Sequence, residues 1–449
     1  MSLSQQSRIR AAAFAACGLA CATGAVFAAS ASDQPTAILP AYADAAPASS
    51  APAAPVAPAD DSEKPLMGFL TQIGIGKPLQ DARINIYGWV EGSYEYNFNA
   101  GSEHLPGPVN RNFDRTFDFF QVNKGQLNQI DLTLERTVDL TTHQFDIGGR
   151  VDLMYGSDAR FTTTYDFLQN QRGEYQFDLP NAYVDIAVPL GNGVRVRVGR
   201  VAFFKSVDPN QNPLYTHTIA YDKALPFTLT GVSAYYPITP DLSVEAGFSR
   251  GWNLAMNDNN GGVDGFGRIV WQASESAKFK LGVITGPEQF HDNSDYYTVV
   301  DLTYAQDITE HLALFFDAVY GDRTHSNGSL PGSFEGPTFN GTIFTAPKDE
   351  QYYGISGTAI YELCDAASLV GRLEWFDDAS GLDQRFDGIN TSFYSATLGL
   401  RITPFPNSAL GKNFIVRPEI RYDYASKPTF SGLMRYDQTT VAVDAIFNF

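Results

Sequence analysis

Charged side chains recur at alternate positions within several otherwise apolar segments of this chain. In residues 194–198, for example, Arg195 and Arg197 alternate with three valines. Because such charges share one side of an extended strand, they could set the electric field that a nearby ion meets, or they could pair with one another and hold a wall rigid. We expect these charges to face the interior of the folded protein and call them the inward-facing set. Its members are Arg150, Asp152, Arg195, Arg197, Arg372, Glu374, Arg401, Arg417, Glu419 and Arg421.

The same alternation continues from Ile84 to the end of the chain and predicts β-strands throughout. Residues 241–249 and 414–424 are clear examples, with apolar and polar side chains on opposite faces. The predicted strands are longer than the roughly five or six residues of a typical sandwich strand. Aromatic pairs such as Tyr235-Tyr236 and Tyr352-Tyr353 stand at segment ends, where the aromatic girdles of a membrane barrel lie.

The joints between the predicted strands alternate between short and long. Bacterial outer-membrane barrels have short periplasmic turns, long external loops and an even number of strands. We therefore expect an all-β fold, a membrane-spanning antiparallel up-and-down β-barrel of about 16 strands, within a range of about 14–18. Short joints fall at 139–142, 191–193, 238–241, 274–277, 306–311, 363–367 and 403–413, and long ones near 98–123, 156–176, 202–229, 253–262, 286–294, 322–349, 378–390 and 426–437.

The N-terminus has the pattern of an export signal. Arg8 and Arg10 precede an apolar, small-residue stretch from Ala11 to Phe27, which is typical of a secretory signal peptide. The Ala-, Pro- and Ser-rich stretch that follows buries little and predicts an extended spacer. The predicted organisation is a signal peptide at 1–28, a periplasmic spacer at 29–65, a short N-terminal periplasmic segment at 66–83, which is either a small helix or a plug, and the barrel at 84–449.

The last residue, Phe449, completes the apolar face of an alternating final strand. This ending resembles the assembly signal of outer-membrane barrels. It implies the barrel-assembly machinery as a partner during biogenesis, and outer-membrane lipids as the surroundings of the folded chain.

The joint at 202–229 is long and yet rich in aromatic residues, which an exposed flexible loop disfavours. Long loops that keep an ordered composition are usually functional. We expect this joint to fold into the barrel and narrow it, although a simple external loop is the alternative. Its candidate constriction charges are Lys205, Asp208, Asp222 and Lys223.

Composition argues against several other functions. The formal net charge of −19 argues against nucleic acid as a partner. The six histidines lack metal-ligand spacing, and Cys364 is the one cysteine outside the predicted signal. Nucleophile-elbow, phosphate-loop and dinucleotide motifs are absent from the sequence. We expect no enzymatic activity, no cofactor and no metal site; the Asn- and Gly-rich stretch 257–262 could hold calcium but more readily forms a turn.

Three stretches carry a family resemblance: Ile86-Tyr-Gly-Trp-Val-Glu-Gly-Ser-Tyr-Glu-Tyr-Asn, Val198-Gly-Arg-Val and Pro226-Phe-Thr-Leu-Thr-Gly-Val. They resemble the "putative β-barrel porin-2 (OmpL-like)" family of bacterial outer-membrane proteins, and the similarity runs through nearly all of 84–449. The resemblance implies an outer-membrane channel without a cofactor, and it assigns no functional residues.

Three functional hypotheses follow. The first is a porin that passes small hydrophilic solutes or ions through a water-filled lumen, with a homotrimer as one assembly that the sequence allows. The second is a barrel with a blocked lumen that acts as an adhesin or receptor. The third is a secreted β-rich carbohydrate-active protein.

Overall fold

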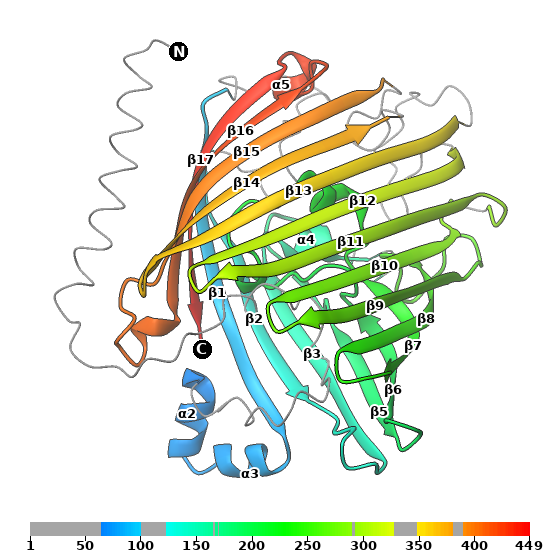
Figure 1. The fold of residues 1–449 in the computed structure, drawn as a ribbon, viewed down its shortest axis with the longest axis vertical. Helices are drawn as coiled ribbons and strands as arrows, with labels where there is room; N and C mark the ends of the chain where they lie inside the picture. Colours follow the sequence, from blue (N-terminus) through cyan, green and yellow to red (C-terminus); the bar gives the residue numbers. More distant parts are fainter. Residues whose placement is uncertain are drawn as a thin grey trace.

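The computed structural model describes residues 64–99, 123–164, 167–168, 170–289, 292–326, 348–379 and 389–449. The predicted signal peptide at 1–28 and nearly all of the predicted spacer at 29–65 lie outside these residues. The described chain is mostly antiparallel strand (Figure 1). The strands are β1 (Ile84–Asn97), β2 (Lys124–Arg136), β3 (Asp146–Gly156), β4 (Gln176–Asp178), β5 (Ala182–Val188), β6 (Val194–Val201), β7 (Leu229–Pro237), β8 (Leu242–Trp252), β9 (Asp264–Ser274), β10 (Ala277–Pro287), β11 (Tyr296–Thr309), β12 (Leu312–Ser326), β13 (Lys348–Cys364), β14 (Ala367–Asp378), β15 (Thr391–Ile402), β16 (Phe414–Ala425) and β17 (Asp437–Asn448).

The strands form one closed barrel. Neighbours in the chain pair in sequence, and β1 closes the ring by pairing with β17, with Trp89 opposite Asn448. The three-residue β4 pairs with one end of β3, and β5 pairs with the other end. Thus β4 and β5 occupy one position in the wall, and the barrel has the predicted 16 strands. The predicted alternation of short and long joints is also confirmed, except that β4 lies at the end of the joint predicted at 156–176.

The barrel wall is apolar outside and polar inside. In β2, Ile130, Leu132 and Leu134 are 39%, 37% and 48% exposed, whereas Asp131 and Thr133 are fully buried. Successive strand residues point to opposite faces, so the exposed apolar residues form the outer surface and the buried polar residues face the interior. A bilayer favours this arrangement because a charge that faces lipid at mid-depth costs about 2–4 kcal/mol.

Two short helices precede the first strand, α2 (Pro65–Gln72) and α3 (Gly76–Asp81). They lie beside the start of β1, at the short-turn end of the barrel (Figure 1). Met67 is fully buried, and its sulfur accepts from the backbone N–H of Ile86 at 3.4 Å. None of the helices in the described ranges is long and apolar enough to cross a bilayer.

The segment between β6 and β7, residues 202–228, is called the inner loop below. It contains a short 3₁₀-helix, η3 (Pro209–Gln211), and a π-helical turn, η4 (Ala220–Ala224). Its aromatic residues pack on the inner face of the wall: the rings of Phe203 and Phe266 lie 4.7 Å apart. The Tyr352 hydroxyl of β13 donates to the Ala224 carbonyl at 2.7 Å. These contacts explain the aromatic composition, since the loop has its own apolar core within the barrel.

Candidate functional site: the barrel interior

Arg417 of β16 is a buried contact between the wall and the inner loop. Its side chain is 1% exposed, and its Nη1 donates to the carbonyls of Pro209 and Asn212 at 2.7 and 2.5 Å. The other face of the guanidinium pairs with Asp444 of β17 at 2.6 Å and with Glu91 of β1 at 3.1 Å. One planar cation therefore links the inner loop to three wall strands.

Neighbouring charges on β14 and β16 hold the next part of the inner loop. Glu419 accepts from the backbone N–H of Tyr215 at 2.9 Å, and Glu374 accepts from that of Ile219 at 2.7 Å. Arg421 and Arg372 donate to the His217 carbonyl at 2.5 and 3.2 Å. Strand alternation aims these four side chains inward, and their role in the structure is to satisfy loop backbone groups that would otherwise be buried without partners.

The inner loop also reaches the wall strands at the start of the chain. The Tyr215 hydroxyl accepts from Ser93 of β1 at 2.9 Å and from Gln126 of β2 at 3.2 Å. The side-chain amide of Gln129 donates to the Val207 carbonyl at 3.0 Å. The loop is thus fastened on β1 and β2 as well as on β14 and β16, and it occupies this part of the barrel interior.

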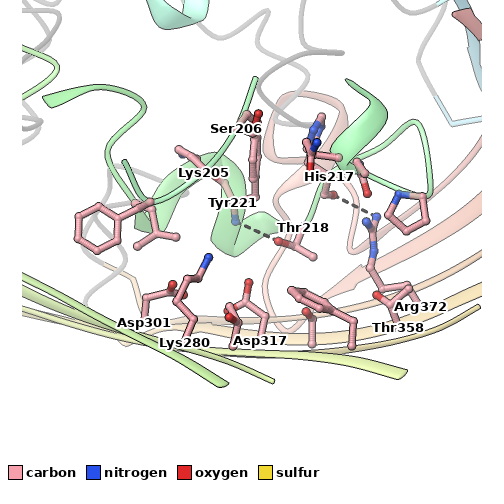
Figure 2. Close-up of a pocket in the computed structure, with 18 of the residues that line it drawn as sticks. Lys205, Ser206, His217, Thr218, Tyr221, Lys280, Asp301, Asp317, Thr358 and Arg372 are labelled. Carbon is pink, nitrogen blue, oxygen red and sulfur yellow. Dashed lines mark hydrogen bonds between the residues drawn. The ribbon is translucent and has the colours of Figure 1, made fainter. Parts of the chain in front are cut away.

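A cavity of about 130 Å³ remains on the other side of the inner loop, against β10 to β14 (Figure 2). Lys280, Asp301 and Asp317 point into it from the wall, and Lys205 and His217 belong to the inner loop on its other side (Figure 2). Asp301 is 1% exposed, and its Oδ1 has no hydrogen-bond partner among the described residues. Such a polar space has room and partners for several water molecules or a small polar solute.

The loop residues in this cavity have shifted proton affinities. Burial lowers the pKa of Lys205 well below its usual range, although Asp222 opposes the shift. Burial also lowers the pKa of His217, and the nearby Arg372 and Arg417 lower it further. Burial raises the pKa of Asp208, whose carboxylate accepts from the Asn210 N–H at 2.9 Å. His217 is therefore neutral near pH 7, because burial and the neighbouring cations all disfavour the imidazolium.

Four other charges of the inward-facing set, Arg150, Asp152, Arg195 and Arg197, form ion pairs within the wall. Arg150 and Asp152 meet at 2.6 Å, and Arg195 lies 3.2 Å from Glu245. Arg197 forms two 2.8 Å hydrogen bonds with Asp185. From the sequence, these charges could either contact a permeating ion or pair with one another. The structure shows them paired.

Three further candidates lie away from the cavity lining. Arg401 is half-buried near the end of β15, opposite Ser368 of β14. Asp222 and Lys223 belong to η4, and Asp222 is buried. Lys205 and Asp208 line the cavity, as does Arg372 from the inward-facing set.

Sequence analysis missed five residues that matter in this interior. Lys280, Asp301 and Asp317 line the cavity, and Glu91 and Asp444 hold Arg417. The signal was present, because each stands between apolar or small neighbours on an alternating strand. Their inward phase could have been read from that alternation, but their spatial partners could not.

No group of three or more His, Cys, Asp or Glu side chains within the described ranges is arranged to hold a metal ion. Cys364, at the end of β13, is half-buried and forms no disulfide within the described residues. The cavity offers electrostatic chemistry, because fixed charges and hydrogen-bonding groups surround a polar space.

A closed barrel of 16 antiparallel strands, with an apolar outer surface and a charged interior, defines an outer-membrane protein of the porin class. Residues 83–449 match the family described as "Putative beta-barrel porin-2, OmpL-like". The chain belongs to this family, as the sequence resemblance predicted. No curated protein is significantly similar to it in sequence.

Solved porins share the fold at low sequence identity. Pseudomonas putida OprB is 12% identical with a TM-score of 0.53, and the match covers 84% of this chain and 97% of that one. Salmonella typhi OmpF, solved with daunomycin, is 10% identical with a TM-score of 0.50, and the match covers 82% of this chain and 99% of that one. At such identities the similarity shows the fold alone.

Proposed function

We propose that this outer-membrane porin lets small hydrophilic solutes or ions diffuse passively between the inner loop and the wall formed by β10 to β14. The observation that carries the proposal is the polar cavity there, which has charges of both signs on its two sides. Lys280, Asp301 and Asp317 are the wall groups that a solute would meet, and Lys205 and Asp208 are the loop groups. Because they form a narrow charged space, they would set which ions pass.

Apart from Arg401, the charges of the inward-facing set divide into those that bond the inner loop and those that pair within the wall. The side chains that bond the inner loop are positioning residues in this proposal, because they hold the loop that narrows the channel: Arg372, Glu374, Arg417, Glu419 and Arg421. The paired arginines Arg150, Arg195 and Arg197 stabilise the wall.

Swelling of liposomes that contain the purified protein tests this proposal. Uncharged sugars of increasing size should enter at rates that fall steeply with size, because the inner loop narrows the passage. Liposomes that contain heat-unfolded protein are the control. If no solute causes swelling, passive diffusion through this barrel is excluded.

A second candidate function is a barrel whose lumen is blocked and whose external loops bind a surface partner. The observation that favours it is the attachment of the inner loop to β1 and β2 as well as to β14 and β16. A variant that lacks residues 206–224 separates the two. If the intact protein is silent and the deletion conducts, the blocked barrel is correct. The outward apolar belt does not fit a secreted carbohydrate-active protein.

For biogenesis, we propose that residues 1–28 are a signal peptide, that 29–65 are a spacer, and that 66–83 lie on the periplasmic side. The helices of 66–83 adjoin the short-turn end, where barrels of this class have their periplasmic turns. N-terminal sequencing of the exported protein would show whether cleavage occurs near residue 28.

Phe449 is the proposed assembly signal read by the barrel-assembly machinery. In the structure it also completes the seam, because its N–H and carbonyl both bond Gly88 of β1 at 2.9 Å. Deleting Phe449 should lower the yield of heat-modifiable barrel in membranes, and an unchanged yield would argue against this role. A homotrimer is the proposed assembly, and native mass spectrometry in detergent tests it.

A further inference from the structure

Two buried carboxyl groups meet at the long-loop end of β8, β9 and β10. Asp264, the first residue of β9, is 0% exposed, and Glu288, directly after β10, is 1% exposed. The two carboxyl groups lie within hydrogen-bonding reach of each other. Glu288 Oε1 accepts from the backbone N–H of Trp252 at 2.9 Å, whereas Glu288 Oε2 and both oxygens of Asp264 have no donor from any other described residue.

This pair differs from the other buried carboxylate pairs in the described part of the barrel. Glu91 and Asp444 share Arg417, and Asp131 and Asp152 lie beside Arg150. Asp301 and Asp317 lie beside Lys280. The charges that act most strongly on Asp264 and Glu288 are each other and a third acid, Asp258. Burying two carboxylates side by side without a cation is costly, so the pair needs either a shared proton or a bound cation.

Two glycines leave space around the oxygens of Asp264 and Glu288. Gly251 and Gly286 leave room for the carboxyl groups, because a Cβ on Gly286 would lie 1.8 Å from Asp264 Oδ1 and one on Gly251 would lie 3.0 Å from Glu288 Oε1. Asn259 donates from Nδ2 to the Glu288 carbonyl at 2.9 Å, and its own Oδ1 is buried without a hydrogen-bond partner among the described residues. The available ligand atoms here are therefore all oxygens, as hard divalent cations require.

We propose that Asp264 and Glu288 bind a divalent cation, with Ca²⁺ as the best match, and that Asn259 Oδ1 is a candidate third protein ligand. Ca²⁺ accepts amide and backbone oxygens and water beside carboxylates, so two acidic side chains suffice to begin its coordination. The ion would fix the loop at 253–263 to the end of β10, where Asn260 already donates to the Pro287 carbonyl at 2.6 Å. This site lies apart from the inner loop and does not depend on solute passage.

Terbium luminescence tests the site in the folded full-length protein after chelator treatment. Tb³⁺ replaces Ca²⁺, and Trp252, whose N–H bonds Glu288, is placed to sensitise its emission. We expect a saturable signal that Ca²⁺ displaces. Glu288→Gln and Asp264→Asn should each weaken binding by about tenfold or more, because fewer ligand charges lower calcium affinity.

The matched control is Asp292→Asn, which removes the same charge from the β10–β11 loop. Asp292 already accepts from the Ser294 N–H at 2.7 Å, so its loss should leave binding unchanged. If the variants do not fold, the wild-type protein alone still tests the site, because bound Ca²⁺ should raise its unfolding temperature. The proposal is overturned if Ca²⁺ changes neither luminescence nor stability and Glu288→Gln is as stable as wild type. That result would mean that the two carboxyl groups share a proton instead.

Discussion

Replacing Arg417 with alanine should release the inner loop and enlarge the channel. The substitution removes the hydrogen bonds to the Pro209 and Asn212 carbonyls, both of which come from a charged donor. Such bonds contribute about 1.5–3 kcal/mol each, so the attachment weakens by about 3–6 kcal/mol. This corresponds to a fall of about 10²- to 10⁴-fold in the ratio of attached to released loop.

Limited trypsin digestion of the folded barrel measures that release. Lys205 is 3% exposed and Lys223 is half-buried, so both should resist cleavage in the wild-type protein and become susceptible in Arg417→Ala. The single-channel conductance should increase in the same variant. Arg435→Ala is the matched control, because Arg435 forms an exposed 3.3 Å pair with Asp437.

Loss of Arg417 also leaves Glu91 and Asp444 buried without their cation, which costs about 3–5 kcal/mol in comparable pairs. Heat modifiability on a gel must therefore show first that the barrel still forms, and Arg417→Lys keeps the charge if it does not. A folded Arg417→Ala barrel with wild-type trypsin resistance and conductance would refute the role of Arg417 as a loop anchor.

Three more predictions follow from the same contacts. Asp301→Asn removes a negative charge from the cavity wall, so the reversal potential in a salt gradient should shift toward anions; an unshifted potential would place Asp301 outside the path. Arg195→Ala should leave that potential unchanged and cost about 1.5–3 kcal/mol of stability, because the 3.2 Å bond to Glu245 is lost while Glu245 keeps its 2.7 Å pair with Arg268; a shifted potential with unchanged stability would contradict this. His217 has a lowered pKa, so below about pH 6.5 the unfolded chain binds more protons than the folded one. The free energy of unfolding should therefore decrease as the pH is lowered, by at most about 1.4 kcal/mol per pH unit. His217→Asn should accordingly lose less stability than wild type between about pH 7.5 and about pH 5 in thermal melts, and an equal loss would count against a buried neutral His217.

The strands and joints could be predicted from sequence because their signals are local. Alternation in 241–249 already shows which side chains share a face, and the turn at 238–241 matches the observed gap between β7 and β8. A membrane barrel adds the constraint that the outer face must be apolar, so the phase of each strand is fixed as well.

The partners of the inward charges could not be predicted, because they are distant in the chain. Arg417 and Glu91 are 326 residues apart, and Glu419 and Tyr215 are 204 apart. The alternation placed Arg417 and Glu419 inward, but only the fold shows that they bond backbone groups of the inner loop. The pairing of Arg197 with Asp185 likewise needed the register of β5 and β6.

Conductance of the purified protein in a planar lipid bilayer tests the central claim most directly. The account predicts stepwise insertion events of uniform size, and larger steps for the variant that lacks residues 206–224. It is contradicted if the folded, heat-modifiable protein gives no steps at any voltage; steps from the deletion variant alone would then show a blocked barrel.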